Sequence, residues 1–298
     1  MERIKIGMIG LDTSHAVIFT RLLNDKKHPD HIEGGEVISA FPVASPELES
    51  SVTRIERFTE EVRKLGVRIT ESLEETVAEC DAILLETVDG AKHARQLKEI
   101  LPFEKPVFVD KPLCLSHSEA ISIQEEAGKY GTPVMSASAL RYMEGLKEIL
   151  SMPGKGRIVG ADCYGPMEMM EQQPGYFWYG IHTIEMLFAI LGRGGRPSVI
   201  QANEQSDLIV AEWEDGRFGT IRGSRIGNGE FGAVVHFEKG SEFISTASLE
   251  RSLYANLMEE IVSFFKTGKS RVPLEETVEI IDFIERANEK RQKLLPRG

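Results

Sequence analysis

The chain has 298 residues, of which 41% are hydrophobic and 28% charged, and its formal net charge is −12. This length predicts about two globular domains, and an acidic balance without a basic patch argues against a nucleic-acid partner. The longest apolar runs, such as residues 186–191, fall far short of the roughly 20 residues of a membrane span. The N-terminal sequence MERIKIGMIG lacks the apolar core and cleavage site of a signal peptide, so we expect a cytoplasmic protein without membrane contact.

The three cysteines, Cys80, Cys114 and Cys163, are far apart in the chain and odd in number. Their arrangement has neither metal-ligand spacing nor a disulfide pattern. We therefore expect free thiols in a reducing compartment.

Short apolar runs alternate with helical patterns up to about residue 140. Parallel strands are buried on both faces and take the form of continuous apolar runs, and helices between them imply right-handed crossovers. The predicted strands are residues 4–10, 36–41, 67–70, 81–87, 105–110 and 132–138, and the predicted helices are 16–23, 45–66, 72–80, 91–101 and 116–131. This order predicts an α/β fold whose N-terminal domain, residues 1–139, is a Rossmann-type doubly wound parallel sheet.

The pattern changes in the remaining half of the chain, where strand-like runs follow one another directly. The predicted helices are residues 141–152, 178–192, 252–268 and 274–292, and the strands lie within 156–165, 198–204, 207–224 and 231–247. Asp215-Gly216 and Lys239-Gly240 are typical hairpin turns. The pattern predicts an α+β domain over residues 140–298 with a large, open, mostly antiparallel sheet.

Ligands in an open parallel sheet bind beyond the carboxyl ends of the strands, and the first such segment is GLDTSH, residues 10–15. A dinucleotide-binding turn normally reads GxGxxG, which lets backbone amides at a helix N-terminus approach the pyrophosphate. Only Gly10 of that pattern is present, while hydroxyls and amides from Thr13 to His15 remain available to hold a phosphate. Asp12 either repels a phosphate or caps the helix, and a plain capped helix start is the alternative.

The second predicted strand ends in Ala40-Phe41-Pro42, without the acidic residue that binds the adenosine ribose in such folds. The choice between NAD and NADP is therefore open.

Two further segments, ETVDGAKH and VDKPLCLS, follow predicted strands. Thr87 and Val88 line the expected crevice, and His93 in the next helix is either a structural contact or a functional residue. Lys111 ends its strand between apolar flanks. A buried lysine can polarise an oxygen or relay a proton, and an ordinary surface lysine is the alternative.

The segment WYGIHTIEML places His182 and Glu185 on one helix face. A histidine is the natural base for removing a hydroxyl proton, and a core histidine is the alternative. No partner ligands for a His-x-x-Glu metal site stand out by spacing, so we expect no metal. The neighbouring Trp178 and Tyr179 predict an aromatic wall for a sugar-like substrate or simple packing.

Taken in order, these segments resemble the glucose–fructose oxidoreductase/inositol dehydrogenase/MocA (Gfo/Idh/MocA) family along nearly the whole chain. VDKPLCLS is similar to that family's E-K-P segment, ETVDGAKH to its T-P-N-x-x-H segment, and SASALRY to the end of its last Rossmann strand. GIHTIEMLFAILG resembles its G-x-H-x-x-D helix, and EWEDGRFGTIRGS its hairpin in the open sheet. The resemblance implies NAD or NADP, a sugar-like or polyol substrate, and homodimers or homotetramers through the C-terminal sheet.

The resemblance gives Lys111 the role of the lysine near nicotinamide and substrate, and His182 that of the catalytic histidine. Trp178 departs from the aspartate of alcohol-oxidising members, and Pro42 from the acidic ribose anchor. The residues expected to bind the cofactor are Gly10, Asp12, Thr13, Ser14, His15, Thr87, Val88, His93, Asp110, Lys111 and Arg141. Those expected to bind substrate are Lys111, Trp178, Tyr179 and His182.

The sequence thus predicts an NAD(P)-dependent oxidoreductase that transfers a hydride between nicotinamide and a carbon bearing a hydroxyl or carbonyl group. His182 is the expected acid/base, and Lys111 holds and polarises the oxygen. One alternative is an enzyme that uses a tightly held nicotinamide for elimination or glycoside cleavage. Another is a small-molecule binding protein that has kept the fold and lost the chemistry, an alternative motivated by the altered turn at residues 10–15 and by Trp178.

Overall fold

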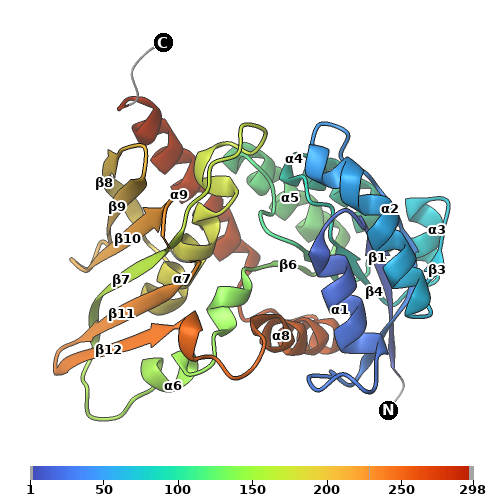
Figure 1. Ribbon diagram of the computed structural model, residues 1–298, viewed down its shortest axis with the longest axis horizontal. Coiled ribbons are helices and arrows are strands. Elements are labelled where there is room, and N and C mark those ends of the chain that lie inside the picture. Colours follow the sequence, from blue (N-terminus) through green and yellow to red (C-terminus); the bar gives the residue numbers. More distant parts are fainter. Residues whose placement is uncertain (1–2, 228, 295–298) are drawn as a thin grey trace. The chain divides into compact units, whose positions relative to one another are not determined.

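A computed structural model describes residues 3–227 and 229–294 of the protein (Figure 1). The chain divides into two compact units, which are described separately. The first unit combines Met1–Cys114, Ser118–Ala137 and Tyr254–Thr277, and the second combines Leu115–His117, Ser138–Leu253 and Val278–Gly298.

The first unit is built on a six-stranded sheet in the order β3-β2-β1-β4-β5-β6, in which every neighbouring pair is parallel. Its strands are β1 (Ile4–Ile9), β2 (Gly35–Phe41), β3 (Arg68–Ile69), β4 (Ala82–Leu85), β5 (Val107–Val109) and β6 (Val134–Ser136). All residues of β4, β5 and β6 are buried, as expected for strands covered on both faces. The predicted Rossmann-type parallel sheet is confirmed.

Helices connect these strands and begin at recognisable caps. They are α1 (Ser14–Asn24), α2 (Glu49–Lys64), α3 (Leu73–Ala78), α4 (Gly90–Ile100) and α5 (His117–Tyr130), with a short 3₁₀ helix, η1 (Leu101–Phe103). The side chains of Thr13, Ser72 and Asp89 accept hydrogen bonds from first-turn amides of α1, α3 and α4. Such caps satisfy amides that have no partner within the helix.

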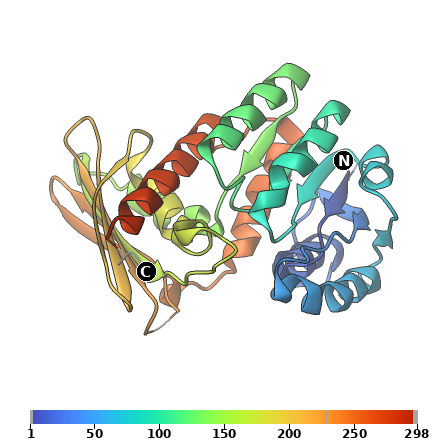
Figure 2. The same cartoon turned by 90° about the horizontal axis from the view of Figure 1, so that it is seen from above.

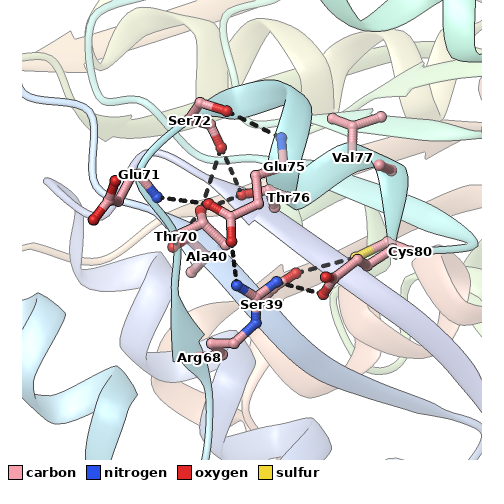
Figure 3. A network of polar contacts seen from close by, with 12 residues as sticks. Ser39, Ala40, Arg68, Thr70, Glu71, Ser72, Glu75, Thr76, Val77 and Cys80 are labelled. Atoms are coloured by element: carbon pink, nitrogen blue, oxygen red, sulfur yellow. Dashed lines mark hydrogen bonds and ion pairs between the residues drawn. The ribbon is translucent and has the colours of Figure 1, made fainter.

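A polar network holds the edge strand β3 and helix α3 to the sheet, as Figure 3 shows. The Glu75 carboxylate accepts hydrogen bonds from the Arg68 guanidinium and from the Glu71 amide. Further in, the Ser39 hydroxyl lies 3.3 Å from the sulfur of Cys80. A strand of two residues has few ladder hydrogen bonds of its own, so these side chains stabilise its position.

Helix α8 (Leu253–Thr267) belongs to the first unit from Tyr254 onward. The rings of Tyr254 and Phe19 are in edge contact, and Val262 lies beside Gly35 at the start of β2. The sequence analysis assigned this helix to the C-terminal domain. An amphipathic pattern shows that a helix packs on something, but it does not show on which sheet.

The second unit contains a six-stranded mixed sheet in the order β12-β11-β7-β10-β9-β8. Its strands are β7 (Ile158–Pro166), β8 (Arg196–Ala202), β9 (Ser206–Glu212), β10 (Phe218–Ser224), β11 (Gly232–Phe237) and β12 (Gly240–Ser245). Only the β7–β10 pair is parallel, so the predicted mostly antiparallel sheet is confirmed. Gly216 and Gly240, at the two predicted hairpin turns, have φ angles of +85° and +107°, which favour glycine.

Helix α7 (Gly180–Leu191) packs on this sheet, with Leu187 against Gly219 of β10 and Thr183 against Gly165 of β7. Figure 2 shows α7 (yellow-green) and the second half of α9 (Leu274–Gln292, dark red) along one face of the strands. The opposite face exposes large apolar side chains. Among them are Val199, Leu208, Phe218 and Phe243, which are between 38% and 62% exposed.

The remaining helices of the second unit are short. They are η2 (Ala139–Tyr142), α6 (Leu146–Leu150), η3 (Gly175–Phe177) and η4 (Thr246–Ser248). The single helix predicted over residues 141–152 is wrong, because Gly145 adopts a φ of +82° and separates η2 from α6.

No helix in the described part of the chain is long and apolar enough to cross a lipid bilayer. The three cysteines form no disulfide and are buried, and burial raises the pKa of the Cys80 and Cys163 thiols.

Candidate functional site

The carboxyl ends of β1, β4 and β5 form one edge of the first sheet, which we call the strand-end edge. Gly10 follows β1 there with a φ of +88°, and a Cβ at this position would lie 2.4 Å from the Thr87 backbone nitrogen. Only glycine fits such a close approach. The first predicted glycine therefore brings the segment after β1 against the segment after β4.

Asp12 connects the turn to two other segments. Its carboxyl oxygens accept hydrogen bonds from the Val88 amide at 2.9 Å and from the Ser51 hydroxyl at 2.7 Å. Burial raises the pKa of this carboxyl, and the two hydrogen bonds partly oppose the shift. Thr13, rather than Asp12, caps α1 by accepting from the His15 amide, and Ser14 at the first position of the helix is exposed.

His15, Glu86 and Asp110 form a cluster at the strand-end edge. The His15 Nδ1 atom lies 2.7 Å from an Asp110 oxygen, and its Nε2 atom lies 3.1 Å from the Tyr254 hydroxyl. Glu86 has no exposed surface, and neither of its carboxylate oxygens has a hydrogen-bond partner. His15 and Asp110 were expected at the site, whereas Glu86 and Tyr254 were not.

The two carboxyl groups of this cluster, those of Glu86 and Asp110, have pKa values shifted in opposite directions. Burial, followed by the nearby charge of Asp110, raises the pKa of Glu86 well above its ordinary value. Burial also opposes ionisation of Asp110, but the charge and hydrogen bond of His15, with the charge of Lys111, hold its pKa well below the usual range. The surroundings therefore favour the ionised form of Asp110 and the neutral form of Glu86.

Lys111 is the second residue after β5 and is partly buried. Burial lowers the pKa of its ammonium group, and the charge of Asp110 opposes that shift. Its backbone amide donates a 2.9 Å hydrogen bond to the Asp110 carboxylate, and its peptide bond to Pro112 is cis. The lysine thus belongs to the same edge as the cluster.

His93 has a structural position. It is fully buried, and its ring nitrogens lie 2.7 Å and 2.8 Å from the carbonyl oxygens of Thr87 and Pro112. The Thr87 hydroxyl in turn accepts from Gln96. These contacts tie together the segments after β4 and β5, which supports the structural interpretation of His93.

In the second unit, His182 lies in the first turn of α7 with a ring nitrogen 2.8 Å from the Ser138 hydroxyl. Its ring makes edge contacts with Tyr179 and Phe231. Trp178 precedes the helix and contacts Tyr179. The imidazole is thus held between one hydrogen bond and two aromatic rings.

The other polar residues of this region are paired with each other. Arg141 and Glu185 form a buried ion pair, so the Glu185 carboxylate is engaged by a guanidinium. This pairing engages the carboxylate of the His-x-x-Glu spacing with a protein cation. It also places Arg141, expected at the cofactor, in the second unit.

A cavity of about 390 Å³ adjoins this histidine in the second unit. Tyr179 and Phe231, which both contact the His182 ring, form part of its lining, together with Glu168 and Arg225. The sequence analysis missed Phe231, Glu168 and Arg225, because they lie in segments without a motif. The cavity combines aromatic surface with one acidic and one basic side chain, as a site for a polar organic molecule requires.

The strand-end edge fits a phosphate-bearing ligand. The 11-residue helix α1 directs its N-terminus to this edge. Asp12 replaces a glycine of the usual turn, but its buried carboxyl is bonded to Val88 and Ser51. It therefore offers a ligand less negative charge than an exposed carboxylate does.

Comparison with known proteins agrees with this architecture. Residues 4–138 match a family model, GFO_IDH_MocA, described as an oxidoreductase family with an NAD-binding Rossmann fold. None of the curated proteins matches the sequence.

Several solved structures share the fold over nearly the whole chain. GenD2 from gentamicin A biosynthesis, solved with NAD, is 15% identical with a TM-score of 0.80, over 98% of this chain and 95% of its own. A probable dehydrogenase from Thermotoga maritima is 18% identical with a TM-score of 0.76, over 97% of each chain. A myo-inositol dehydrogenase from Corynebacterium glutamicum is 14% identical with a TM-score of 0.76, over 99% of this chain and 100% of its own.

Proposed function

Residues 4–138 form a Rossmann domain of the Gfo/Idh/MocA oxidoreductase family, whose cofactor is NAD or NADP, and from this premise we propose a specific reaction. The protein oxidises or reduces a small sugar-like or polyol substrate at a carbon that bears a hydroxyl or carbonyl group. The nicotinamide supplies or accepts the hydride. The family match, together with Lys111 at the strand-end edge, carries the proposal.

Lys111 binds the reacting oxygen of the substrate. It is the second residue after β5 and is partly buried. A cation on a strand end stabilises negative charge that develops on an alcohol oxygen as its proton leaves. The hydrogen bond from its backbone amide to the Asp110 carboxylate fixes the backbone of this lysine.

His182 takes up or returns the hydroxyl proton. The Ser138 hydroxyl orients its ring, and two lining residues of the 390 Å³ cavity contact it. Tyr179 and Phe231 provide aromatic surface of the kind that stacks on sugar rings. Trp178 completes the aromatic group next to Tyr179.

The first test is thermal unfolding of nucleotide-free protein with NAD⁺, NADH, NADP⁺ and NADPH. A ligand at about 100 times its Kd stabilises by roughly 2.7 kcal/mol, so one redox pair should raise Tm by several degrees. The preferred nucleotide is then used to screen sugars and polyols as substrates, with the absorbance of the reduced nicotinamide as the measure of turnover. No shift with any of the four nucleotides contradicts the proposal.

The second test replaces the two proposed catalytic residues. Lys111→Met and His182→Asn should each lower kcat by about 10²–10⁴ while leaving the Tm close to that of the parent protein. Lys98→Met and His236→Asn are matched controls, because both side chains are surface residues of the same units. Equal turnover in the active-site and control variants would contradict the catalytic roles proposed for Lys111 and His182.

A small-molecule binding protein without catalysis is the second candidate. Asp12 and His15 stand where the usual turn has glycines, and both engage other protein groups. If this candidate is correct, a sugar-like ligand shifts the Tm while no nicotinamide nucleotide does.

We further propose that the chain forms a homodimer through the exposed face of the second sheet. Phe218 and Phe243 are 56% and 62% exposed on the face of the six-stranded sheet that α7 does not cover, and association would remove these apolar side chains from water. Sedimentation analysis should give twice the monomer mass, and Phe218→Lys should shift it toward the monomer. A monomeric parent protein contradicts this part of the proposal.

A further inference from the structure

The cluster at the strand-end edge has the composition of a metal site. His15, Glu86 and Asp110 each offer one nitrogen or oxygen atom, and these atoms all lie within 4.8 Å of one another. His15 lies in the first turn of α1, and Glu86 and Asp110 directly follow β4 and β5. No spacing in the sequence therefore reveals them as a set. Ligand atoms of a single metal ion are about 3–4 Å apart, because metal–ligand bonds are about 2.0–2.6 Å long. A bound ion would replace the hydrogen bond between His15 Nδ1 and Asp110 Oδ2, which are 2.7 Å apart.

Glu86 provides independent evidence for an occupant. It is fully buried, and both of its carboxylate oxygens are without a hydrogen-bond partner. Buried polar atoms in folded proteins are almost always satisfied, and leaving a carboxyl unsatisfied is costly. Since Glu86 belongs to the cluster, the group that satisfies it lies beside His15 and Asp110.

The other two side chains are already oriented by outer contacts. The Tyr254 hydroxyl lies 3.1 Å from His15 Nε2, and the Lys111 amide donates to Asp110 Oδ1 at 2.9 Å. These contacts leave His15 Nδ1 and Asp110 Oδ2, which are 2.7 Å apart, on the cluster side. Metal-binding histidines and carboxylates are typically fixed by hydrogen bonds of this kind through their second atom.

We propose that His15, Glu86 and Asp110 bind one divalent transition-metal ion, such as Zn²⁺ or Mn²⁺. Two carboxylates balance the charge of a divalent cation, and an imidazole nitrogen favours a transition metal over Mg²⁺ or Ca²⁺. The ion would join the ends of β1, β4 and β5 and satisfy Glu86. The inference concerns the first unit alone and goes beyond the proposed function, on which it does not depend.

The test measures metal binding by the full chain after chelator treatment and dialysis. Titration with Zn²⁺ and with Mn²⁺, followed by calorimetry, should show one equivalent per chain. Glu86→Gln keeps the size and hydrogen-bonding capacity of the side chain but removes the anionic ligand. The substitution should weaken metal binding at least about tenfold. Removal of a hydrogen-bond partner of a metal ligand already lowers metal affinity by about tenfold or more, and loss of a ligand should cost no less.

The matched control uses a second group of potential ligands, His117, Asp282 and Glu285, which lies in the second unit and is partly exposed. Asp282→Asn should leave the single equivalent and its affinity unchanged. Circular dichroism confirms that both variants are folded. Binding that is weakened by Glu86→Gln and kept by Asp282→Asn supports the proposal, and any other pattern overturns it.

The proposed metal site can also be tested on the unmodified protein, without any variant. Pulsed electron paramagnetic resonance of bound Mn²⁺ should detect coupling to one imidazole nitrogen, from His15. Absence of Mn²⁺ and Zn²⁺ binding, or bound Mn²⁺ without a nitrogen ligand, overturns the assignment.

Discussion

Asp207 in the second unit and Glu86 in the first unit are both buried carboxyls, but their surroundings are opposite. Asp207 accepts hydrogen bonds from the Tyr176 hydroxyl at 2.9 Å and from Arg225 and Arg291 at 2.6 Å each. Glu86 accepts none. A carboxylate surrounded by protein donors has a structural role, whereas one without donors at a strand-end edge is available to a ligand.

Removing the fully paired carboxylate should have the largest effect. Asp207→Ala leaves two arginines near each other without their anion and the Tyr176 hydroxyl without its acceptor. Breaking a buried pair of this kind costs about 3–5 kcal/mol, which urea denaturation measures directly. Asp215→Ala, which removes a half-exposed partner of Arg217, is the control and should change stability little. Equal effects in the two variants would contradict the structural role of Asp207.

Two buried glutamates, Glu185 and Glu86, allow a paired and an unpaired carboxyl to be compared by the same substitution to glutamine. Glu185→Gln weakens the buried ion pair with Arg141 and should destabilise the protein by about 3 kcal/mol. Glu86→Gln removes no protein contact and should leave the free energy of unfolding of the metal-free protein nearly unchanged. Chemical denaturation of both variants in the presence of a chelator makes the measurement. Strong destabilisation by Glu86→Gln would show that Glu86 has protein partners after all.

The strand-end edge also contains a glycine that can be compared with one elsewhere. Gly10 and Gly66 both have a φ of +88°, but a Cβ at Gly10 would lie 2.4 Å from the Thr87 backbone, while nothing lies within 4 Å of one at Gly66. Gly66→Ala should cost about 1–2 kcal/mol for the left-handed conformation alone. Gly10→Ala should cost about 1–3 kcal/mol more, because the backbone of the neighbouring segment has to move. Similar midpoints in urea would argue against the close approach of the segments after β1 and β4.

Most of the fold was predictable because the spacing of apolar residues along the chain indicates which residues are buried. The continuous apolar runs of β1, β4 and β5 follow from a sheet covered on both faces, and Gly216 and Gly240 follow from hairpin geometry. The position of α8 was not predictable, since its apolar face fits either sheet. The left-handed Gly145 in the predicted helix 141–152 was missed because a single glycine is often tolerated in a helix.

The candidate site was predictable where a residue directly follows a strand. Asp110 meets that condition, Lys111 is the next residue, and His15 lies in the first turn of the helix after β1. The structure brings these three residues to one edge. Glu86 meets the condition as well, but it ends an apolar run and was counted as part of the strand. Tyr254 gave no signal, since it is 239 residues from His15 in the chain and reaches it only through packing.

The smallest expected effect concerns the pH dependence contributed by Asp12. Burial raises the pKa of its carboxyl in the folded protein above the ordinary value of 3.8. A raised folded pKa means that its contribution to stability is complete below about pH 4 and is lost as the pH rises through the folded pKa. Asp12→Asn keeps an acceptor for the Val88 amide and cannot ionise, so the Tm of the variant relative to the parent protein should rise by a few degrees between pH 4 and pH 8. Thermal unfolding of both proteins across this range measures the difference. A parallel pH profile for Asp12→Asn and the parent protein would mean that the Asp12 carboxyl is ionised throughout and that hydrogen bonds from Ser51 and Val88 outweigh its burial.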